Sequence, residues 1–442
     1  MKRILSVLLS VCLLFAVVSC ETVVPEIKDV SAVLVEPAKT SPITYEEKKS
    51  QPFTDFKQTA NGFAYKFSPL ALNGIKNDEN SAVSPLSVFM ALCIAGECSN
   101  GETQNQILSA LGLSLEQMRK NFSLLYRQLN RKYYGDGYDG DVLISEMSLT
   151  NSIWLDESLP TVRECLDTLG NDYYCFGKSV DFNGDNQSAN DSIRKFIKDQ
   201  THGLIDKNFD ISPETIFTII NTLYLKDLWN SEGDELQKTS PIPFTNADGT
   251  VKNAELLMGR YLDGKVFTAP SFSGFYTTTA SGFKLNFILP NDGYTAKDVF
   301  TQENLALFNS QTDFDWIDVE NKIKYYTRCL FPEYTASFDQ DVLNILKDDF
   351  GIIDLFDIRK CDFCSLIGNL PAYCSGVSHV TSLNVNAMGI EGAAVTVMPV
   401  AGATGPDEYT EVYLDFTLDK PFGFMLCDVD GTVLFSGIVN NI

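Results

Sequence analysis

The chain has 442 residues, of which 44% are hydrophobic and 21% are charged, and its formal net charge is −24. A surface this acidic repels the phosphates of nucleic acids and other polyanions. No cluster of lysine or arginine reverses the charge locally. We therefore expect no binding to nucleic acid.

The N-terminus has the pattern of an export signal. Two basic residues precede an apolar run over residues 4–18, and a small residue stands before Cys20. The run is too short for a transmembrane helix, which needs about 20 apolar residues. Residues 17–20 resemble the bacterial lipobox, which implies that residues 1–19 are removed and that Cys20 carries a lipid. We expect a lipid-anchored protein of the bacterial cell envelope, at the outer membrane. The alternative is an ordinary signal peptide in which Cys20 has no role.

The next segment, residues 20–55, has the composition of a flexible tether. It contains four prolines among Ser, Thr, Glu and Lys, and it shows little apolar periodicity. The remaining residues, 56–442, contain no proline or glycine cluster that divides them convincingly. Their number exceeds the usual size of a single domain. We expect one large domain whose sheets share a core.

Helix signals are clear early in this domain. Ser84 suits an N-cap and Pro85 suits the first turn of a helix. The apolar run over residues 88–95 indicates that this helix is buried. Thr103 is placed to cap a further helix, with Gln106 three residues later.

A segment near the C-terminus, residues 384–403, has the pattern of a strand and is followed by a polar loop. Alternate positions are small or apolar, and the only charge, Glu391, belongs to the other set. A period of two is what a half-buried strand needs. We interpret this segment as a strand that requires a sheet. The alternate positions are Ile390, Gly392, Ala394, Thr396, Met398, Val400 and Gly402.

Motifs spread along the chain occur in a fixed order and spacing. The early ones are Asn80, Ser84, Pro85, Ser87, Leu92, Gly101, Thr103 and Gln106, and the later ones lie in residues 151–156, 221–229, 287–290, 419–422 and 434–440. Together they resemble the motifs of the serpins, the large serine-protease-inhibitor family, in order over about residues 56–442. The resemblance implies an α+β serpin fold with three β-sheets, about eight to nine helices and an exposed reactive-centre loop.

The resemblance also implies a function for the strand-like segment. In serpins this segment is a hinge followed by the bait for a protease. The target, a serine or cysteine protease, is acylated by the loop, and the cut loop then inserts into the central sheet and traps it. The hinge positions are Gly389, Ile390, Glu391, Gly392, Ala393, Ala394, Val395 and Thr396.

The usual family spacing from the hinge places the reactive bond at Ala403–Thr404. Counting back from the C-terminal motif instead allows any bond over residues 400–407. The small aliphatic residues Val400, Ala401 and Ala403 favour an elastase-like or subtilisin-like target, or a cysteine protease of similar preference. No arginine or lysine lies in this part, which argues against trypsin-like targets. We expect the target protease and the membrane as partners, and a monomer.

Insertion of the loop would release enough energy to distort a protease. Fifteen residues over 389–403 at about 3.3 Å each span about 50 Å. About one ladder hydrogen bond per residue, at about 1 kcal/mol net, gives about 15 kcal/mol.

Three features of the segment depart from the inhibitory pattern. Ala387 and Met388 stand where acidic residues are usual, and Ile390 stands where a small polar residue is usual. Pro399 lacks the N–H that a central strand uses. The alternative function is therefore a non-inhibitory serpin-fold lipoprotein that binds a ligand or partner.

The residues give no support to an enzyme. A histidine among serines, His379, suggests a hydrolase, but no G-x-S-x-G elbow is present. A glycan-binding or hydrolytic lipoprotein is a further alternative, but no carboxylate pair in the sequence supports it. No metal site or cofactor motif appears. The resemblance assigns His379 to the serpin shutter, a hydrogen-bonded cluster beneath the central sheet. Its predicted members are Ser84, Ser87, Asn221 and His379.

Overall fold

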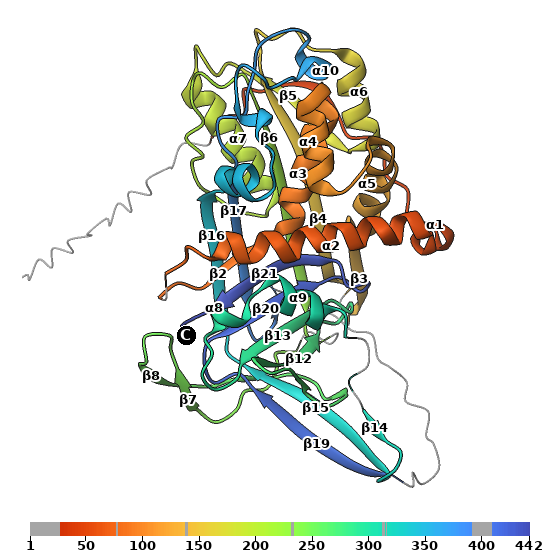
Figure 1. Cartoon of the computed structure of the whole chain (residues 1–442), viewed down its shortest axis with the longest axis vertical. Coiled ribbons are helices and arrows are strands. Elements are labelled where there is room, and N and C mark those ends of the chain that lie inside the picture. Colours follow the sequence, from red (N-terminus) through yellow and green to blue (C-terminus); the bar gives the residue numbers. More distant parts are fainter. Residues whose placement is uncertain are drawn as a thin grey trace, which may run out of the picture.

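The structure is a computed structural model. It describes residues 27–76, 78–137, 140–230, 234–311, 314, 316–390 and 409–442. These residues form three large β-sheets and a separate hairpin, with most of the longer helices grouped at one end of the molecule (Figure 1). Among them no helix is both long enough and apolar enough to cross a bilayer.

The central sheet has eight strands, in the order β1-β5-β4-β6-β18-β17-β16, and β3 pairs with β4. The strand β6 runs antiparallel to β4 and lies in the middle of the sheet. The strands are β1 (Ala32–Val35), β3 (Arg131–Gly137), β4 (Gly140–Asp156), β5 (Cys175–Val180), β6 (Phe217–Leu228), β16 (Tyr334–Asp341), β17 (Ser378–Val385) and β18 (Gly389–Ile390).

A second, six-stranded sheet follows the order β11-β12-β13-β20-β21-β2, and a third sheet is built around β15. The second comprises β2 (Ser81–Val83), β11 (Phe267–Thr268), β12 (Phe272–Thr278), β13 (Lys284–Pro290), β20 (Phe422–Cys427) and β21 (Val433–Val439). The third comprises β9 (Leu257–Met258), β10 (Leu262–Asp263), β14 (Ile317–Asp318), β15 (Ile323–Phe331) and β19 (Thr410–Thr417), and the hairpin is β7 (Ile242–Thr245) with β8 (Val251–Ala254).

The described residues contain ten α-helices, several of them one turn long, which exceeds the expected number. The α+β class and the three large sheets agree with the expectation. The helices are α1 (Tyr45–Lys49), α2 (Gln51–Leu72), α3 (Pro85–Cys98), α4 (Gly101–Leu111), α5 (Leu115–Leu129), α6 (Arg163–Asp172), α7 (Asn186–Gln200), α8 (Ala296–Val299), α9 (Gln302–Asn309) and α10 (Cys364–Ile367), with a π-helix over Ile345–Asp349 and a 3-10 helix over Asp354–Phe356.

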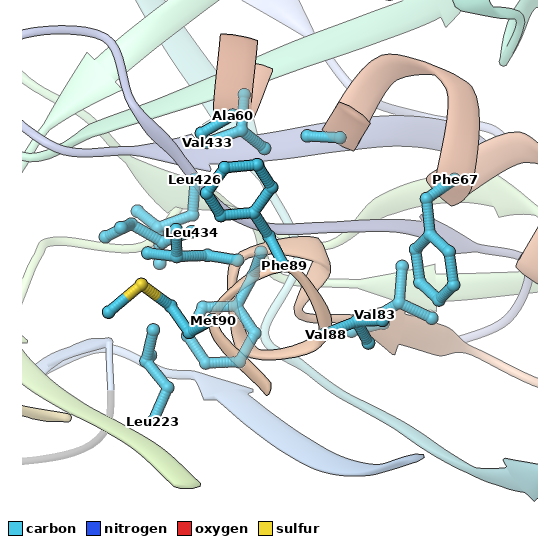
Figure 2. Close-up of a cluster of buried hydrophobic side chains, with 14 of the residues drawn as sticks. Ala60, Phe67, Val83, Val88, Phe89, Met90, Leu223, Leu426, Val433 and Leu434 are labelled. Carbon is cyan, nitrogen blue, oxygen red and sulfur yellow. The ribbon is translucent and has the colours of Figure 1, made fainter. Parts of the chain in front are cut away.

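Helix α3 joins the central sheet to the second sheet. The Ser84 hydroxyl caps its first turn and Pro85 occupies the first position, as predicted. Figure 2 shows Met90 of this helix between Leu223 of β6 and Leu434 of β21, all three of them buried. Because apolar side chains surround the helix, the two sheets share one core.

The N-terminal segment differs from the expected tether. Strand β1 adds to the edge of the central sheet by pairing with β5, and Val35 fills the space beside Gly170 and Gly177. The helix α2 begins at Gln51, ahead of the predicted boundary at residue 56. Residues 32–35 show no clear alternation of burial, so their role as an edge strand depends on a complementary surface elsewhere in the chain.

The expected cap of α4 is also different. The helix starts at Gly101 with Asn100 as its N-cap. The Thr103 hydroxyl is buried and accepts a hydrogen bond from the Asp362 N–H at 3.1 Å. A tertiary contact thus takes the side chain that the local pattern assigned to capping.

Candidate functional site

The hinge lies between two strands of the central sheet. Strand β18 pairs with β6 through Gly389 and Ile390, and with β17 through Ile390 and Val385. A Cβ atom at Gly389 would lie 2.2 Å from the Asp227 carbonyl oxygen. Only glycine therefore fits at this position of the strand. The Ile390 side chain is fully buried, so an apolar residue suits this position, the first that pairs with both β6 and β17.

Beyond β18 the sheet contains two facing edges that are not paired with each other. On β6 this edge runs over residues 217–226, and on β17 it runs over residues 378–384. We call these two edges the slot. In the described part of the chain no ladder joins them, although β6 pairs with β4 and β17 pairs with β16 on their other sides.

The hinge is held at the mouth of the slot by backbone and side-chain hydrogen bonds. The Trp229 N–H donates to the Met388 carbonyl at 3.2 Å, and its indole N–H donates to the Asn386 carbonyl at 2.7 Å. The Asn386 amide oxygen accepts from the N–H groups of Met388 and Gly389. These contacts position the chain that leaves β17 so that it re-enters the sheet.

A carboxylate from the connection between β15 and β16 contacts this hinge. The Ala387 N–H donates to Glu333 at 2.8 Å, and Lys238 contacts the other oxygen of that carboxylate at 2.7 Å. Burial raises the pKa of Glu333, but the Lys238 ammonium and the Ala387 N–H outweigh it and hold that pKa below its usual value. Glu333 thus supplies a negative charge beside Ala387, where the hinge itself carries none.

A second carboxyl group is buried beside the hinge. Asp227 is fully buried, and its Oδ2 accepts hydrogen bonds from Ser145 and Ser281, while Oδ1 has no partner. Burial raises its pKa to about 6, against the opposing effect of the hydroxyl donors. Asp227 and Glu333 carry no local motif, so the sequence alone did not identify them.

Three of the four predicted shutter residues lie together. The Ser84 N–H donates to His379 Nε2 at 3.1 Å, and its hydroxyl lies 3.2 Å from that of Ser87 and donates to the Leu434 carbonyl at 2.9 Å. Burial lowers the pKa of His379 to about 4, so the ring is neutral. A neutral, enclosed ring that accepts a backbone N–H is part of the packing.

The fourth predicted member, Asn221, is not in this cluster. Its amide Nδ2 donates to the Asn151 side chain on β4 at 2.6 Å. Its Oδ1 is buried and has no partner. The separation has a simple cause, because Asn221 and His379 lie on opposite edges of the slot.

The comparisons with known proteins agree with this geometry. The profile of the serpin family, described as serine protease inhibitor, matches residues 58–442. The chain belongs to the serpin family. It is 23% identical over 401 residues to an uncharacterized serpin-like protein of Methanosarcina acetivorans, which covers 88% of this chain and 86% of that protein. It is 25% identical to a probable non-inhibitory serpin of Oryza sativa subsp. japonica, with 81% of each chain covered.

Solved serpin structures share the fold. The thermophilic serpin tengpin in its native state has a TM-score of 0.69 and 22% identity, and the match covers 93% of this chain and all of tengpin. Tengpin in its latent state gives a TM-score of 0.66 with 21% identity. Identities this low show that the fold is shared and no more.

Several predicted site residues of this serpin lie outside the described residues. They are the lipidation site Cys20, the hinge residues Glu391, Gly392, Ala393, Ala394, Val395 and Thr396, and the reactive bond Ala403–Thr404. Of the predicted hinge, the structure describes Gly389 and Ile390.

The described residues of the serpin contain no group of His, Cys, Asp or Glu suited to a metal ion. Cys361 and Cys364 are spaced as a CxxC pair, and a raised thiol pKa lowers the fraction of reactive thiolate. Burial raises the pKa of Cys361 to about 12, and the Cys364 sulfur accepts a hydrogen bond from Asn100 at 2.7 Å. The other histidine, His202, is half-exposed and contacts Glu146 at 3.0 Å.

Proposed function

We propose that this serpin inhibits proteases as a suicide substrate, by inserting its cleaved loop into the slot. The observation that supports this most directly is β18, which places the first residues of the loop between β6 and β17. Below them, ten residues of β6 offer an edge about 34 Å long at about 3.4 Å per residue. A displacement of this size carries an acylated protease far from its docking position.

The chemistry belongs to the protease. Its serine or cysteine attacks a bond near Ala403–Thr404, the acyl-enzyme forms, and the freed N-terminal part of the loop adds to both edges of the slot. New ladder hydrogen bonds at about 1 kcal/mol each then act on the acyl-enzyme. Deacylation stalls because the active site of the protease is distorted. The small aliphatic residues around the bond favour elastase-like or subtilisin-like targets.

The alternative is a serpin that binds a ligand or partner without trapping a protease, and one relative is named as a probable non-inhibitory serpin. One experiment separates the two functions. The full chain in detergent is incubated with pancreatic elastase and, separately, with subtilisin, and the products are separated on a denaturing gel. A resistant band larger by one protease mass supports inhibition. A nicked chain alone with both proteases would overturn the proposal.

We further propose that Cys20 is lipidated and anchors the protein in the outer membrane of a bacterial cell envelope. The supporting pattern is the lipobox-like sequence that ends at Cys20. Metabolic labelling with palmitate should mark the natural chain and leave a Cys20→Ser variant unlabelled. Labelling that persists in the variant would place the lipid elsewhere.

A further inference from the structure

The end of the molecule opposite the third sheet carries exposed apolar side chains. They lie on the connection over residues 350–377, which leads from the π-helix to β17 and contains α10 (Figure 1). Four large apolar side chains of this connection are 41–55% exposed, and we call them the apolar patch. Its members are Ile353, Ile358, Leu370 and Tyr373.

Contacts on the inner side of this connection fix the apolar patch to the domain. The Gln106 side chain on α4 accepts hydrogen bonds from the N–H groups of Ile353 and the next residue, both at 2.8 Å. The Cys374 N–H donates to the Leu355 carbonyl at 2.9 Å, so Tyr373 lies beside the 3-10 helix. The inner apolar side chains are buried, namely Leu355, Phe363, Leu366 and Ile367. The connection thus has one apolar face against the domain and a second one that is exposed.

Positive charge borders the apolar patch, in a chain whose net charge is −24. The side chains of Arg359 and Lys360 are 83% and 55% exposed, whereas their partners Asp357 and Asp354 are 23% and 10% exposed. The cations of these pairs therefore face solvent more than the carboxylates do. Exposed apolar and aromatic side chains bordered by lysine and arginine are typical of surfaces that lie in the headgroup region of a lipid bilayer.

The described chain begins at the same end of the molecule. Strand β1 pairs with β5, and Figure 1 shows β5 and α10 at one end of the long axis and β14 and β19 at the other. Asp29, which contacts Lys178 of β5 at 3.1 Å, comes nine residues after Cys20. Nine residues span at most about 32 Å, even when fully extended. A lipid on Cys20 would therefore keep this end of the domain beside the bilayer.

We propose that the apolar patch lies in the headgroup region of the bilayer to which the chain is anchored. Strand β19, which follows the reactive loop in the sequence, would then lie at the end of the domain far from the lipid. This inference rests on the proposed lipid anchor and adds the orientation of the domain. Four half-exposed side chains alone would bind a membrane weakly, because stable attachment takes more than one signal. The anchor raises the local concentration of the patch at the bilayer.

Tryptophan emission in vesicles that contain brominated lipid measures this orientation. Of the three tryptophans, Trp154 and Trp229 are buried and Trp316 is exposed next to β14, at the opposite end (Figure 1). The variant Tyr373→Trp adds one indole to the apolar patch. The lipidated chain is reconstituted in phosphatidylcholine vesicles with a minor share of phosphatidylglycerol, with and without bromine in the acyl chains. Bromine should lower the emission of the added tryptophan by at least about two-fold, because an interfacial surface reaches about 5–10 Å into the acyl boundary. It should leave the emission of the natural chain unchanged.

Two double variants in the Tyr373→Trp background test whether the patch makes the contact. Ile358→Ser with Leu370→Ser should abolish most of the quenching. Val251→Ser with Leu307→Ser is the matched control and should quench fully, since these side chains are also exposed but lie on β8 and α9, away from this end (Figure 1). All four side chains are exposed, so the fold should tolerate each change. Equal quenching in the two double variants would overturn the inference.

The unanchored chain, Cys20→Ser, separates failure of this inference from failure of the lipid anchor. With the Tyr373→Trp substitution it should bind vesicles at least about 100-fold more weakly than the anchored chain, and show the same quenching at high lipid concentration. Such quenching without palmitate labelling of the natural chain would overturn the anchor and leave the patch as the membrane contact. No quenching in either chain would overturn the inference, whatever the labelling shows. A dimer in solution that Ile358→Ser with Leu370→Ser dissociates, without quenching, would assign the patch to a second copy of the chain.

Discussion

Two strands of similar length, β20 and β17, have very different neighbours. In the second sheet β20 pairs with β13 on one side and with β21 on the other, over most of its length. In the central sheet β17 pairs with all eight residues of β16 on one side, but on the other side its one ladder pair among the described residues is to Ile390. Strand β20 is therefore paired on both sides, whereas most of one edge of β17 has no partner among the described residues. The difference indicates that the second sheet stabilises the fold and that the central sheet can accept a further strand.

The largest effect should come from a charge on the inserting face. Ala394 belongs to the small and apolar alternate positions of segment 384–403, so Ala394→Arg would place a guanidinium on the face that the proposed insertion buries. An unpaired buried charge is destabilising by about 3–5 kcal/mol. We expect the fraction of trapped elastase to fall by about 100-fold or more, with the nicked chain as the product.

Ala393→Arg is the matched control, since the period of two puts residue 393 in the other set of positions. It should retain at least about a tenth of the trapping. Retained trapping by Ala394→Arg, or equal loss in both variants, would contradict the proposal that residue 394 faces the core when the loop inserts.

A substitution in the second sheet should act differently. Phe424 is fully buried and contacts Tyr334 with a ring separation of 5.4 Å. Phe424→Ala should lower the free energy of unfolding by about 3–5 kcal/mol. Because β20 is already paired on both sides and offers no edge to the loop, intact and nicked protein should lose similar amounts of unfolding free energy in denaturant titrations. A loss confined to one form would show that the second sheet takes part in the change.

The pH dependence separates the hinge from the shutter. The pKa of Asp227 is about 6 in the folded chain against 3.8 when unperturbed, so its contribution to stability is lost as pH rises from about 4 to about 6. The pKa of His379 is about 4 against 6.5, so its contribution is lost as pH falls from about 6.5 to about 4. Each amounts to about 3 kcal/mol, and the two oppose each other in the natural chain.

Single variants should reveal the two slopes. With His379→Gln the chain should become more stable as pH falls toward 4, and with Asp227→Asn it should become less stable. The measurement is the free energy of unfolding at pH 4.5 and 7.0 for each variant. Equal slopes in the two variants would contradict the burial of one of these groups.

Local patterns predicted what depends on local chemistry. The cap of α3 by Ser84 and the cluster with Ser87 and His379 follow from short-range signals and from the family resemblance. The position of Asn221 could not be predicted in this way, because its hydrogen-bond partner depends on whether β6 and β17 lie side by side. The role of Glu333 could not be predicted either, since it contacts Ala387 from the connection between β15 and β16, far away in the sequence. The absence of a charge at Ala387 departs from the inhibitory pattern, and the Glu333 carboxylate supplies a charge beside that residue.

The smallest effect concerns the shutter and tests how much of it depends on the slot. Ser87→Ala removes one hydroxyl 3.2 Å from Ser84 and should lower the free energy of unfolding by about 1 kcal/mol. Ser84→Ala should lower it by more, about 1–3 kcal/mol, because the Leu434 carbonyl then loses its donor. Denaturant titrations of both variants check the order. If insertion of the loop leaves the cluster intact, both losses should persist after nicking, because both serines belong to the start of α3 and not to an edge of the slot. A loss that disappears on nicking would mean that the strand displaces the serines, and the shutter would then be a temporary seal of the intact molecule.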